Sequence, residues 1–191
     1  MTDLTVFGGG SWGTALAAAA AKTGHSVRLW CRRSEQARAI NALGINPDYL
    51  KGIPLPAGLA ATSDPEEAAA GSRLWILALP TQSLRTFLSS LSPGLADGAE
   101  ICNVAKGIEI DTGRRISQIV EEVLPGAPYS VLSGPSFAEE VARGLPAAVT
   151  VASARESSAL LWQSLLNSQR LRLYTSGDVA GTETGGAVKN I

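Results

Sequence analysis

The amino-acid sequence predicts an α/β fold, in which helices cover both faces of a doubly wound, mostly parallel β-sheet. Short unbroken apolar runs alternate with longer stretches of helical periodicity along the chain, as expected for strands that are buried on both faces. The composition agrees with this pattern, because 45% of the 191 residues are hydrophobic while only 5% are aromatic, and 20 residues are glycine. Small side chains favour close packing of helices on a sheet over a sandwich built on aromatic pairs.

The first third of the chain contains two strand–helix pairs and an irregular segment. The two strands and the helices that follow them are expected, in chain order, at Leu4–Phe7, Thr14–Thr23, Ser26–Cys31 and Ser34–Leu43. Gly24 is well placed to end the first helix. The segment Asn46–Pro56 contains three prolines and is therefore expected to be a long exposed loop without regular structure.

Five further strands and six helices are expected in the rest of the chain. Asp64 is followed by Pro65 and two glutamates, which indicates the capped start of a short helix. The later strands are expected at Leu74–Leu79, Glu100–Val104, Tyr129–Leu132, Ala147–Val151 and Leu171–Tyr174. The later helices are expected from Pro80 to about Leu91, at Arg114–Leu124, at Ser136–Arg143, and from a capping box of Ser153 and Glu156 to about Asn167. The last residues, around Gly185–Asn190, read as a further helix.

Charge and cysteine content exclude several classes of protein. The 16 basic and 17 acidic residues give a net charge of −1, so no nucleic-acid partner is expected. No apolar stretch approaches the roughly 18 residues of a membrane-spanning helix, and the first residues do not resemble a signal peptide. We therefore expect a cytoplasmic protein without membrane insertion, whose Cys31 and Cys102 are reduced. No group of residues has the spacing of metal ligands, so no metal is predicted.

A glycine-rich turn follows the first strand. Gly8, Gly10 and Gly13 match the pattern G-x-G-x-x-G between a strand and a helix. In this pattern the first glycine permits a tight turn, the second lets the backbone approach a pyrophosphate, and the third allows close packing of helix on sheet. The position of the match predicts a Rossmann-like dinucleotide-binding site. The alternative is a turn with a purely structural role.

The end of the second strand indicates which dinucleotide would bind. About 20 residues after the glycines, a site selective for NAD has an acidic residue that accepts a hydrogen bond from the ribose 2′-hydroxyl. This chain has Arg32 and Arg33 there instead. Guanidinium groups suit a 2′-phosphate, so the sequence predicts NADP(H) without forbidding NAD(H). The alternative is that both arginines are solvated surface charges.

Three later segments carry candidate substrate residues. Lys106 follows a strand and would lie at the carboxyl edge of the sheet, where open α/β folds bind ligands. Ser136 follows the next strand, where it could cap a helix and face the same crevice. Lys189 lies beside glycines near the end of the sequence, where burial could make it a proton-transferring group. Taken singly, each of the two lysines would more often be an ordinary surface residue.

At these segments the chain resembles the N-terminal domain of NAD(P)-dependent glycerol-3-phosphate dehydrogenase of the soluble bacterial type. The resemblance extends over the whole chain in the family's order. Glycine fingerprints are widespread, but the later motifs are specific in combination. The shared segments are Gly8–Ala17, Leu29–Arg33, Asn46–Pro56, Ala105–Glu109, Ser133–Ala138, Gly144–Pro146 and Gly185–Asn190.

The resemblance implies reversible reduction of dihydroxyacetone phosphate to sn-glycerol 3-phosphate, which feeds glycerophospholipid synthesis. It implies that the residues in contact with NADPH are Ser11, Trp12, Arg32, Arg33, Tyr49, Lys106 and Ala138. It also implies that Lys106, Gly134, Ser136 and Lys189 contact the substrate. Lys189 would be the catalytic residue, because an ammonium group can stabilise and protonate the oxygen on which charge develops.

One departure from the family bears on domain organisation. In the family an all-helical substrate domain follows the last motif, whereas this sequence has two residues after Lys189. We therefore expect residues 1–191 to be the dinucleotide-binding domain of a longer enzyme, homodimeric at full length. Alone, the domain would bind NADP(H) with little or no turnover. Two alternatives stay open, namely a related dehydrogenase acting on ketopantoate or 6-phosphogluconate, and a stand-alone NADP(H)-binding module that senses redox state.

Overall fold

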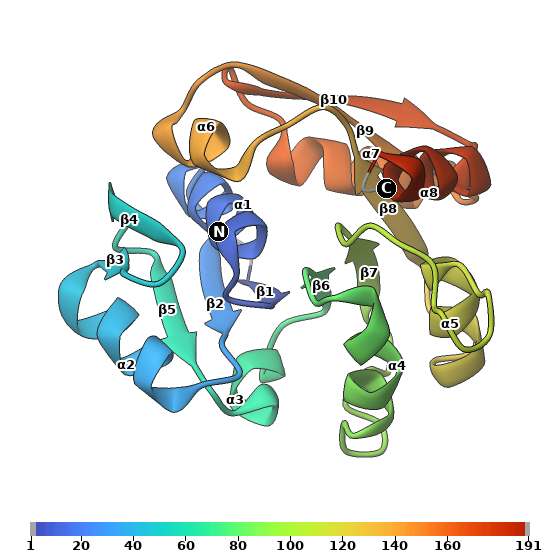
Figure 1. Ribbon diagram of the computed structural model, residues 1–191, viewed down its shortest axis with the longest axis horizontal. Coiled ribbons are helices and arrows are strands. Elements are labelled where there is room, and N and C mark those ends of the chain that lie inside the picture. Colours follow the sequence, from blue (N-terminus) through green and yellow to red (C-terminus); the bar gives the residue numbers. More distant parts are fainter. Residues whose placement is uncertain (1–2, 190–191) are drawn as a thin grey trace.

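The computed structural model describes residues 3–189 and confirms the α/β prediction (Figure 1). Eight strands of this part of the chain form one sheet, and all neighbours are parallel except β8 and β9. The chain builds outward from β1 in one direction and then crosses to β6 on its other side, which is the doubly wound topology. The order across the sheet is β10 (Leu171–Ser176), β9 (Ala147–Ser153), β8 (Tyr129–Ser133), β7 (Glu100–Asn103), β6 (Leu74–Leu77), β1 (Asp3–Phe7), β2 (Ser26–Trp30) and β5 (Leu59–Thr62).

Helices pack against both faces of the sheet. One face shares an apolar core with α1 (Ser11–Lys22), α2 (Ser34–Leu43), α6 (Ala138–Arg143) and α7 (Glu156–Leu166). The other face shares a second core with α3 (Pro65–Ala69), α4 (Thr81–Ser89) and α5 (Ile116–Val123). The last helix, α8 (Val179–Val188), packs against β8 and β9. In Figure 1, α6 lies over α1 at the same end of the sheet.

The central strands explain why the sequence forms two cores. All four residues of β6 are buried, and successive side chains of a strand point to opposite faces. Leu74 and Ile76 accordingly join the core under α1, while Trp75 and Leu77 join the core under α4. This position therefore requires an unbroken apolar run, because a polar side chain on either face would be buried without a hydrogen-bond partner.

The segment after α2 corrects the prediction of an irregular loop at Asn46–Pro56. It forms a hairpin of β3 (Ile45–Asn46) and β4 (Leu50–Pro54), paired antiparallel. The prolines do not prevent this pairing, because they occupy the turn, the end of β4 and the segment after it. Leu50 and Ile53 are buried in the core under α1, so the hairpin is fastened by its apolar side chains. The next strand, β5, was also not expected from the sequence.

Two predicted helix starts are wrong. Ser153 does not open a capping box, because it is the last residue of β9 and its hydroxyl donates to the carbonyl of Tyr129 (2.7 Å). Ser136 is not an N-cap, since α6 begins at Ala138 without a side-chain cap. The cap at Asp64 is confirmed, because its carboxylate accepts hydrogen bonds from the two N–H groups that follow Pro65.

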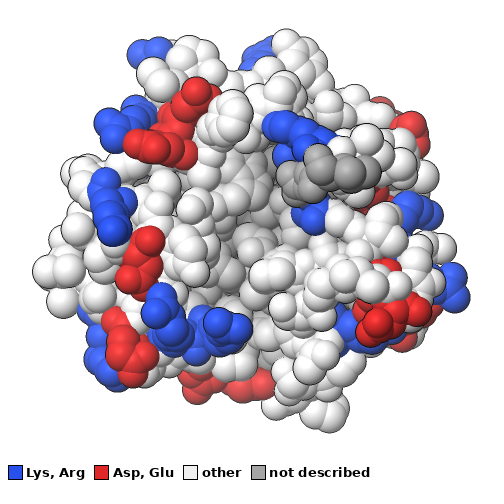
Figure 2. Space-filling view, in the orientation of Figure 1, with Lys and Arg blue, Asp and Glu red and all other residues white. Residues whose placement is uncertain are grey.

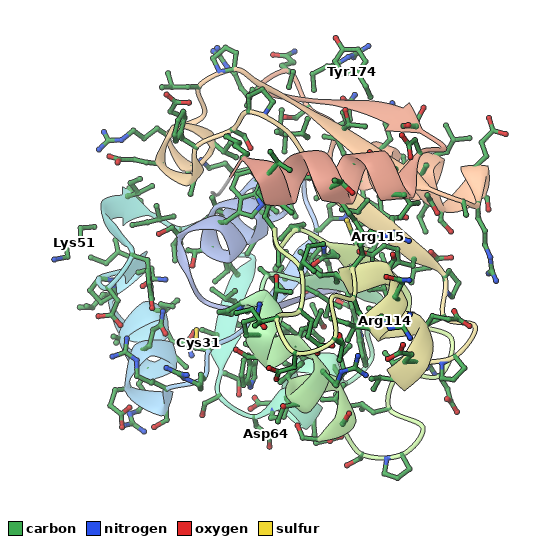
Figure 3. All side chains as sticks on the ribbon, turned by 45° about the vertical axis from the view of Figure 1, so that its right-hand side comes forward. Cys31, Lys51, Asp64, Arg114, Arg115 and Tyr174 are labelled. Carbon is green, nitrogen blue, oxygen red and sulfur yellow. The ribbon has the colours of Figure 1, made fainter. Side chains whose placement is uncertain are left out.

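The two cysteines are free and buried. Burial raises the pKa of the Cys31 thiol to about 11, which leaves it protonated at neutral pH. In Figure 3 this residue lies between the end of β2 and the start of α2. Within residues 3–189, no helix reaches the length and hydropathy needed to cross a bilayer.

Candidate active site at the carboxyl edge of the sheet

The glycine-rich turn joins β1 to α1 and requires two of its glycines. Gly8 has a φ of +128°, and a Cβ there would lie 2.4 Å from the carbonyl oxygen of Ala78. A Cβ at Gly13 would lie 2.0 Å from the carbonyl oxygen of Gly8. Both contacts are impossible for real atoms, so hydrogen is the only side chain that fits. At Gly10, by contrast, a Cβ would meet nothing within 4 Å.

This open side at Gly10 faces the beginning of α1. The helix begins at Ser11, three residues before the predicted start, and its first bond runs from the N–H of Thr14 to the carbonyl of Gly10 (3.0 Å). The preceding N–H groups therefore belong to the open first turn of a helix. Such a turn attracts an anion such as a pyrophosphate. The turn thus has the geometry that the glycine pattern predicts.

A buried polar cluster holds the turn from behind. The side-chain amides of Gln36 and Asn46 both donate to the carbonyl of Gly9, at 2.6 and 3.0 Å. Asn46 also donates to the hydroxyl of Thr14 at 2.8 Å, and it is fully buried. Sequence reasoning missed these residues. A buried asparagine inside a proline-rich segment gives no signal until its partners are known.

Arg32 and Arg33 lie where the sequence places them, directly after β2. Both are exposed, and within the described residues Arg32 has no hydrogen bond or ion pair. Arg33 makes an ion pair with Asp48 of the β3–β4 turn, with 2.5 Å between Nη2 and Oδ2. The hairpin therefore brings a carboxylate to the position at which the second strand itself has none.

Three hollows lie along the carboxyl edge of the sheet. Ser11 lines the first hollow, and its neighbour Trp12 lines the second. Lys106 also lines the second, and its ammonium donates to the carbonyl of Gly134 (3.3 Å), which lines the third. Most predicted site residues line them, namely Ser11, Tyr49 and Ala138 (about 590 Å³), Trp12 and Lys106 (about 300 Å³), and Gly134 and Lys189 (about 330 Å³).

The face drawn in Figure 2 shows a hollow at its centre that uncharged side chains line, with Lys and Arg beside it. Ser136 is half-buried and lines none of the three hollows, although its N–H donates to the carbonyl of Gly134. Asn190, the last residue of the predicted motif, lies outside the described residues. A separate hollow of about 760 Å³ lies at the amino edge, away from the glycine turn.

Lys106 is placed by a tight turn after β7. Asn103 exchanges two hydrogen bonds with the backbone of Ala105, at 3.0 and 3.1 Å. Further along, the carboxylate of Glu109 accepts two hydrogen bonds from Arg85, at 2.9 and 2.8 Å, and this pairing lowers the pKa of Glu109 to about 2. Burial and the positive charge of the neighbouring Lys189 lower the pKa of Lys106.

Lys189 lies at the end of α8, with its ammonium 5.5 Å from the ring centre of Phe137. The helix reaches this position because Gly186 lets it approach β8, where a Cβ would lie 2.8 Å from the hydroxyl of Ser133. The two lysines belong to different elements, yet they lie close enough for the charge of Lys189 to act on Lys106. An anion between them would relieve their mutual repulsion.

The buried carboxylate of Glu183 attaches α8 to the start of α5 and to β8. Glu183 accepts hydrogen bonds from Arg115 (2.6 Å), from the N–H and hydroxyl of Ser117 (2.7 Å each) and from the hydroxyl of Tyr129 (2.7 Å). Burial, and then the carboxylate of Glu183, raise the pKa of Tyr129 well above its ordinary value, so Tyr129 stays a neutral donor. Figure 3 shows Arg115 below α8. Sequence reasoning did not identify this cluster.

Together these features fit a dinucleotide and an anionic substrate. A helix N-terminus with an open glycine can receive a pyrophosphate, and arginines at the end of β2 can receive the adenosine ribose. Lys106 lines the second hollow and Lys189 the third. Among the described residues, no three His, Cys, Asp or Glu side chains are placed to hold a metal ion.

The sequence and the fold of the chain match those of known proteins. Residues 3–159 match the model of the family described as NAD-dependent glycerol-3-phosphate dehydrogenase N-terminus. Curated relatives named glycerol-3-phosphate dehydrogenase [NAD(P)+] include those of Mesorhizobium japonicum, 48% identical, and Rhodospirillum rubrum, 46% identical. Each alignment covers 98% of this chain and 54% of the relative, so the chain spans about half the length of these proteins.

Solved structures extend the comparison. The crystal structure of glycerol-3-phosphate dehydrogenase from Coxiella burnetii is 33% identical with a TM-score of 0.94, over 99% of this chain and 58% of that one. A ketopantoate reductase from Ralstonia eutropha is 18% identical with a TM-score of 0.71, over 95% of this chain and 59% of that one. The second likeness shows a shared fold alone.

Proposed function

The chain belongs to the NAD-dependent glycerol-3-phosphate dehydrogenase family, and from this we propose that it reduces dihydroxyacetone phosphate to sn-glycerol 3-phosphate, reversibly. Residues 1–191 would be the dinucleotide-binding domain, with NADP(H) as the preferred cofactor and NAD(H) also accepted. The single observation that carries the proposal is that three hollows at one edge of the sheet are lined by Ser11 and Trp12 of the glycine turn and by the two lysines.

In the proposed complex, the cofactor extends along these hollows. Its pyrophosphate lies at Gly10 and the first turn of α1, and its ribose end lies at Arg33. Ser11, Tyr49 and Ala138 line the first hollow, between the turn, the hairpin and α6, and Trp12 lines the second hollow, toward Lys106. The nicotinamide end then lies near Lys106.

The bound cofactor supplies a hydride to the carbonyl carbon of the substrate. This chain's own residues would hold the substrate and handle the charge and the proton. Lys106, Gly134 and Ser136 would contact the substrate, and Lys189 would be the catalytic residue that protonates the oxygen atom. Burial and then the charge of Lys189 lower the pKa of Lys106, so a bound anionic substrate would stabilise the charged form of Lys106.

We also propose a cytoplasmic location and, for a full-length enzyme, a homodimer. Both proposals rest on the family resemblance alone. Size-exclusion chromatography with light scattering measures the second one directly, and a monomer at micromolar concentration would contradict it.

Fluorescence titration with NADPH and an activity assay test the function. We expect saturable binding of NADPH by the 191-residue chain, and oxidation of NADPH on addition of dihydroxyacetone phosphate to the full-length enzyme. For the 191-residue chain alone we expect little or no turnover. Absence of NADPH binding would contradict the cofactor assignment, and NADPH oxidation with another ketone but not with dihydroxyacetone phosphate would contradict the substrate.

Replacing Arg33 by alanine is expected to weaken NADPH binding at least tenfold and NADH binding less than twofold. The guanidinium can pair with a 2′-phosphate, which NADH lacks, and a charge-assisted contact of this kind contributes about 1.5–3 kcal/mol. Isothermal titration with each cofactor measures the two constants. Arg38→Ala is the matched control, since it removes an exposed arginine from α2. Equal losses for both cofactors in Arg33→Ala would show that Arg33 does not contact the 2′-phosphate.

A further inference from the structure

The ion pair between Arg33 and Asp48 has a fixed place relative to the glycine turn. The N–H of Asp48 donates to the side-chain oxygen of Asn46 (3.3 Å), and Asn46 itself is buried against the carbonyl of Gly9. The turn of the hairpin is therefore fastened to the pyrophosphate end of the site. The carboxylate of Asp48 is directed at Arg33, with 2.5 Å between Oδ2 and Nη2.

The position of this carboxylate matters for the adenosine ribose. In sites that bind NAD, an acidic group near the end of the second strand accepts hydrogen bonds from the ribose hydroxyls. Here the strand ends in arginines, and Asp48 supplies the acidic group from a different element. The side chains of Arg33 and Asp48 are 53% and 38% exposed, so both are accessible to a ligand and neither belongs to the apolar core.

We propose that Asp48 sets the cofactor preference of this site by competing with the 2′-phosphate of NADP(H) for Arg33. The inference rests on the dinucleotide-binding function proposed above and deepens it. Without a 2′-phosphate, Asp48 neutralises Arg33 and accepts a hydrogen bond from the ribose. With a 2′-phosphate, the carboxylate must release the guanidinium and then lies beside a second negative group.

Both effects weaken NADP(H) binding without weakening NAD(H) binding. A phosphate monoester carries about two negative charges at neutral pH, so its repulsion by a neighbouring carboxylate exceeds that of a single charge. Exposure to water and salt keeps the effect moderate. The site as built therefore accepts both cofactors, and its preference for NADP(H) is smaller than two arginines alone would give.

Titration of NADPH and NADH into the wild-type chain and two variants tests the proposal. Asp48→Asn is expected to tighten NADPH binding about fivefold and to change NADH binding less than twofold, because the amide keeps an acceptor but has no charge. Asp48→Ala is expected to tighten NADPH similarly and to weaken NADH about threefold, since the acceptor is lost. Both gains for NADPH should shrink when salt is raised from about 20 to about 200 mM, because salt screens exposed charges.

Asp97→Asn is the matched control, because it removes an exposed carboxylate at the opposite edge of the sheet. It should leave both constants within twofold of wild type, and thermal unfolding should confirm that every variant is folded. An unchanged ratio of the two constants in Asp48→Asn would overturn the inference, and so would an equal gain for both cofactors. Failure of the wild-type chain to bind either cofactor would overturn the proposed function instead, so the two failures are distinguishable.

Discussion

Replacing Gly13 by alanine is expected to abolish dinucleotide binding and to lower the free energy of unfolding by about 3 kcal/mol. The added methyl carbon would lie 2.0 Å from the carbonyl oxygen of Gly8. Neither atom belongs to a flexible side chain, so α1 would have to move away from β1, and overpacking of this kind costs about 1–3 kcal/mol or more. In an ordinary helix the same change would stabilise by about 0.5–1 kcal/mol. A loss of stability in Gly13→Ala, in place of a gain, would therefore show that α1 approaches the carbonyl of Gly8 too closely for a side chain.

Gly10→Ala is the matched control for that experiment. Its methyl group meets no protein atom within 4 Å, so the free energy of unfolding should change by less than about 1 kcal/mol. Binding of NADPH should nevertheless fall at least tenfold, because the methyl group occupies the space assigned to the pyrophosphate. Urea unfolding and NADPH titration measure the two quantities. Unaltered binding in Gly10→Ala would move the pyrophosphate elsewhere, and full stability in Gly13→Ala would contradict the geometry of the turn.

The parts of the fold that the sequence predicts are those whose causes are local. The glycine turn is one example, since Gly8, Gly10 and Gly13 lie within a few residues of the strand and helix that they join. The central strands are another, because the run from Leu74 to Leu77 must be apolar on both faces to lie at the middle of the sheet. At these positions the local sequence pattern and the surrounding packing favour the same structure.

The parts that the sequence does not predict depend on distant partners. Asn46 looks like a turn residue beside Pro47, yet it is buried because it bonds Gly9, which lies 37 positions away. The strand β5 consists of Leu59–Thr62, a segment with little intrinsic preference for a strand, and it is ordered by pairing with β2. Likewise β9 pairs antiparallel with β8, a direction that apolar content alone does not encode.

The candidate site divides in the same way. Arg33 could be selected from its place after the second strand, but Asp48 could not, because only the hairpin brings it to Arg33. Lys106 and Lys189 could be selected as residues of motifs, but their mutual influence depends on how close α8 lies to β8. Glu183 lies 66 positions from Ser117, and nothing near it in the sequence marks it as buried.

Replacing Glu183 by alanine is expected to lower the free energy of unfolding by about 3–5 kcal/mol, the largest effect of any substitution proposed for this chain. Its side chain is 2% exposed and satisfies Arg115, the backbone and hydroxyl of Ser117, and the hydroxyl of Tyr129. Removing one partner of a buried ion pair leaves an uncompensated charge, and that loss is strongly destabilising. Urea unfolding monitored by circular dichroism measures the effect.

Two further variants separate the buried network from α8 in general. Thr184→Ala removes the neighbouring exposed side chain of the same helix, whose hydroxyl donates to the carbonyl of Ala180, and should change the free energy of unfolding by less than about 0.5 kcal/mol. Glu183→Gln keeps the shape and an acceptor oxygen but removes the charge, so an intermediate loss is expected. In the Glu183 variants, amide hydrogen exchange should be faster in α8 than in α1, because α8 depends on this carboxylate for its attachment whereas α1 lies in the apolar core. A loss below about 1 kcal/mol in Glu183→Ala would show that the packing of Gly186 against β8 alone holds the helix that carries Lys189.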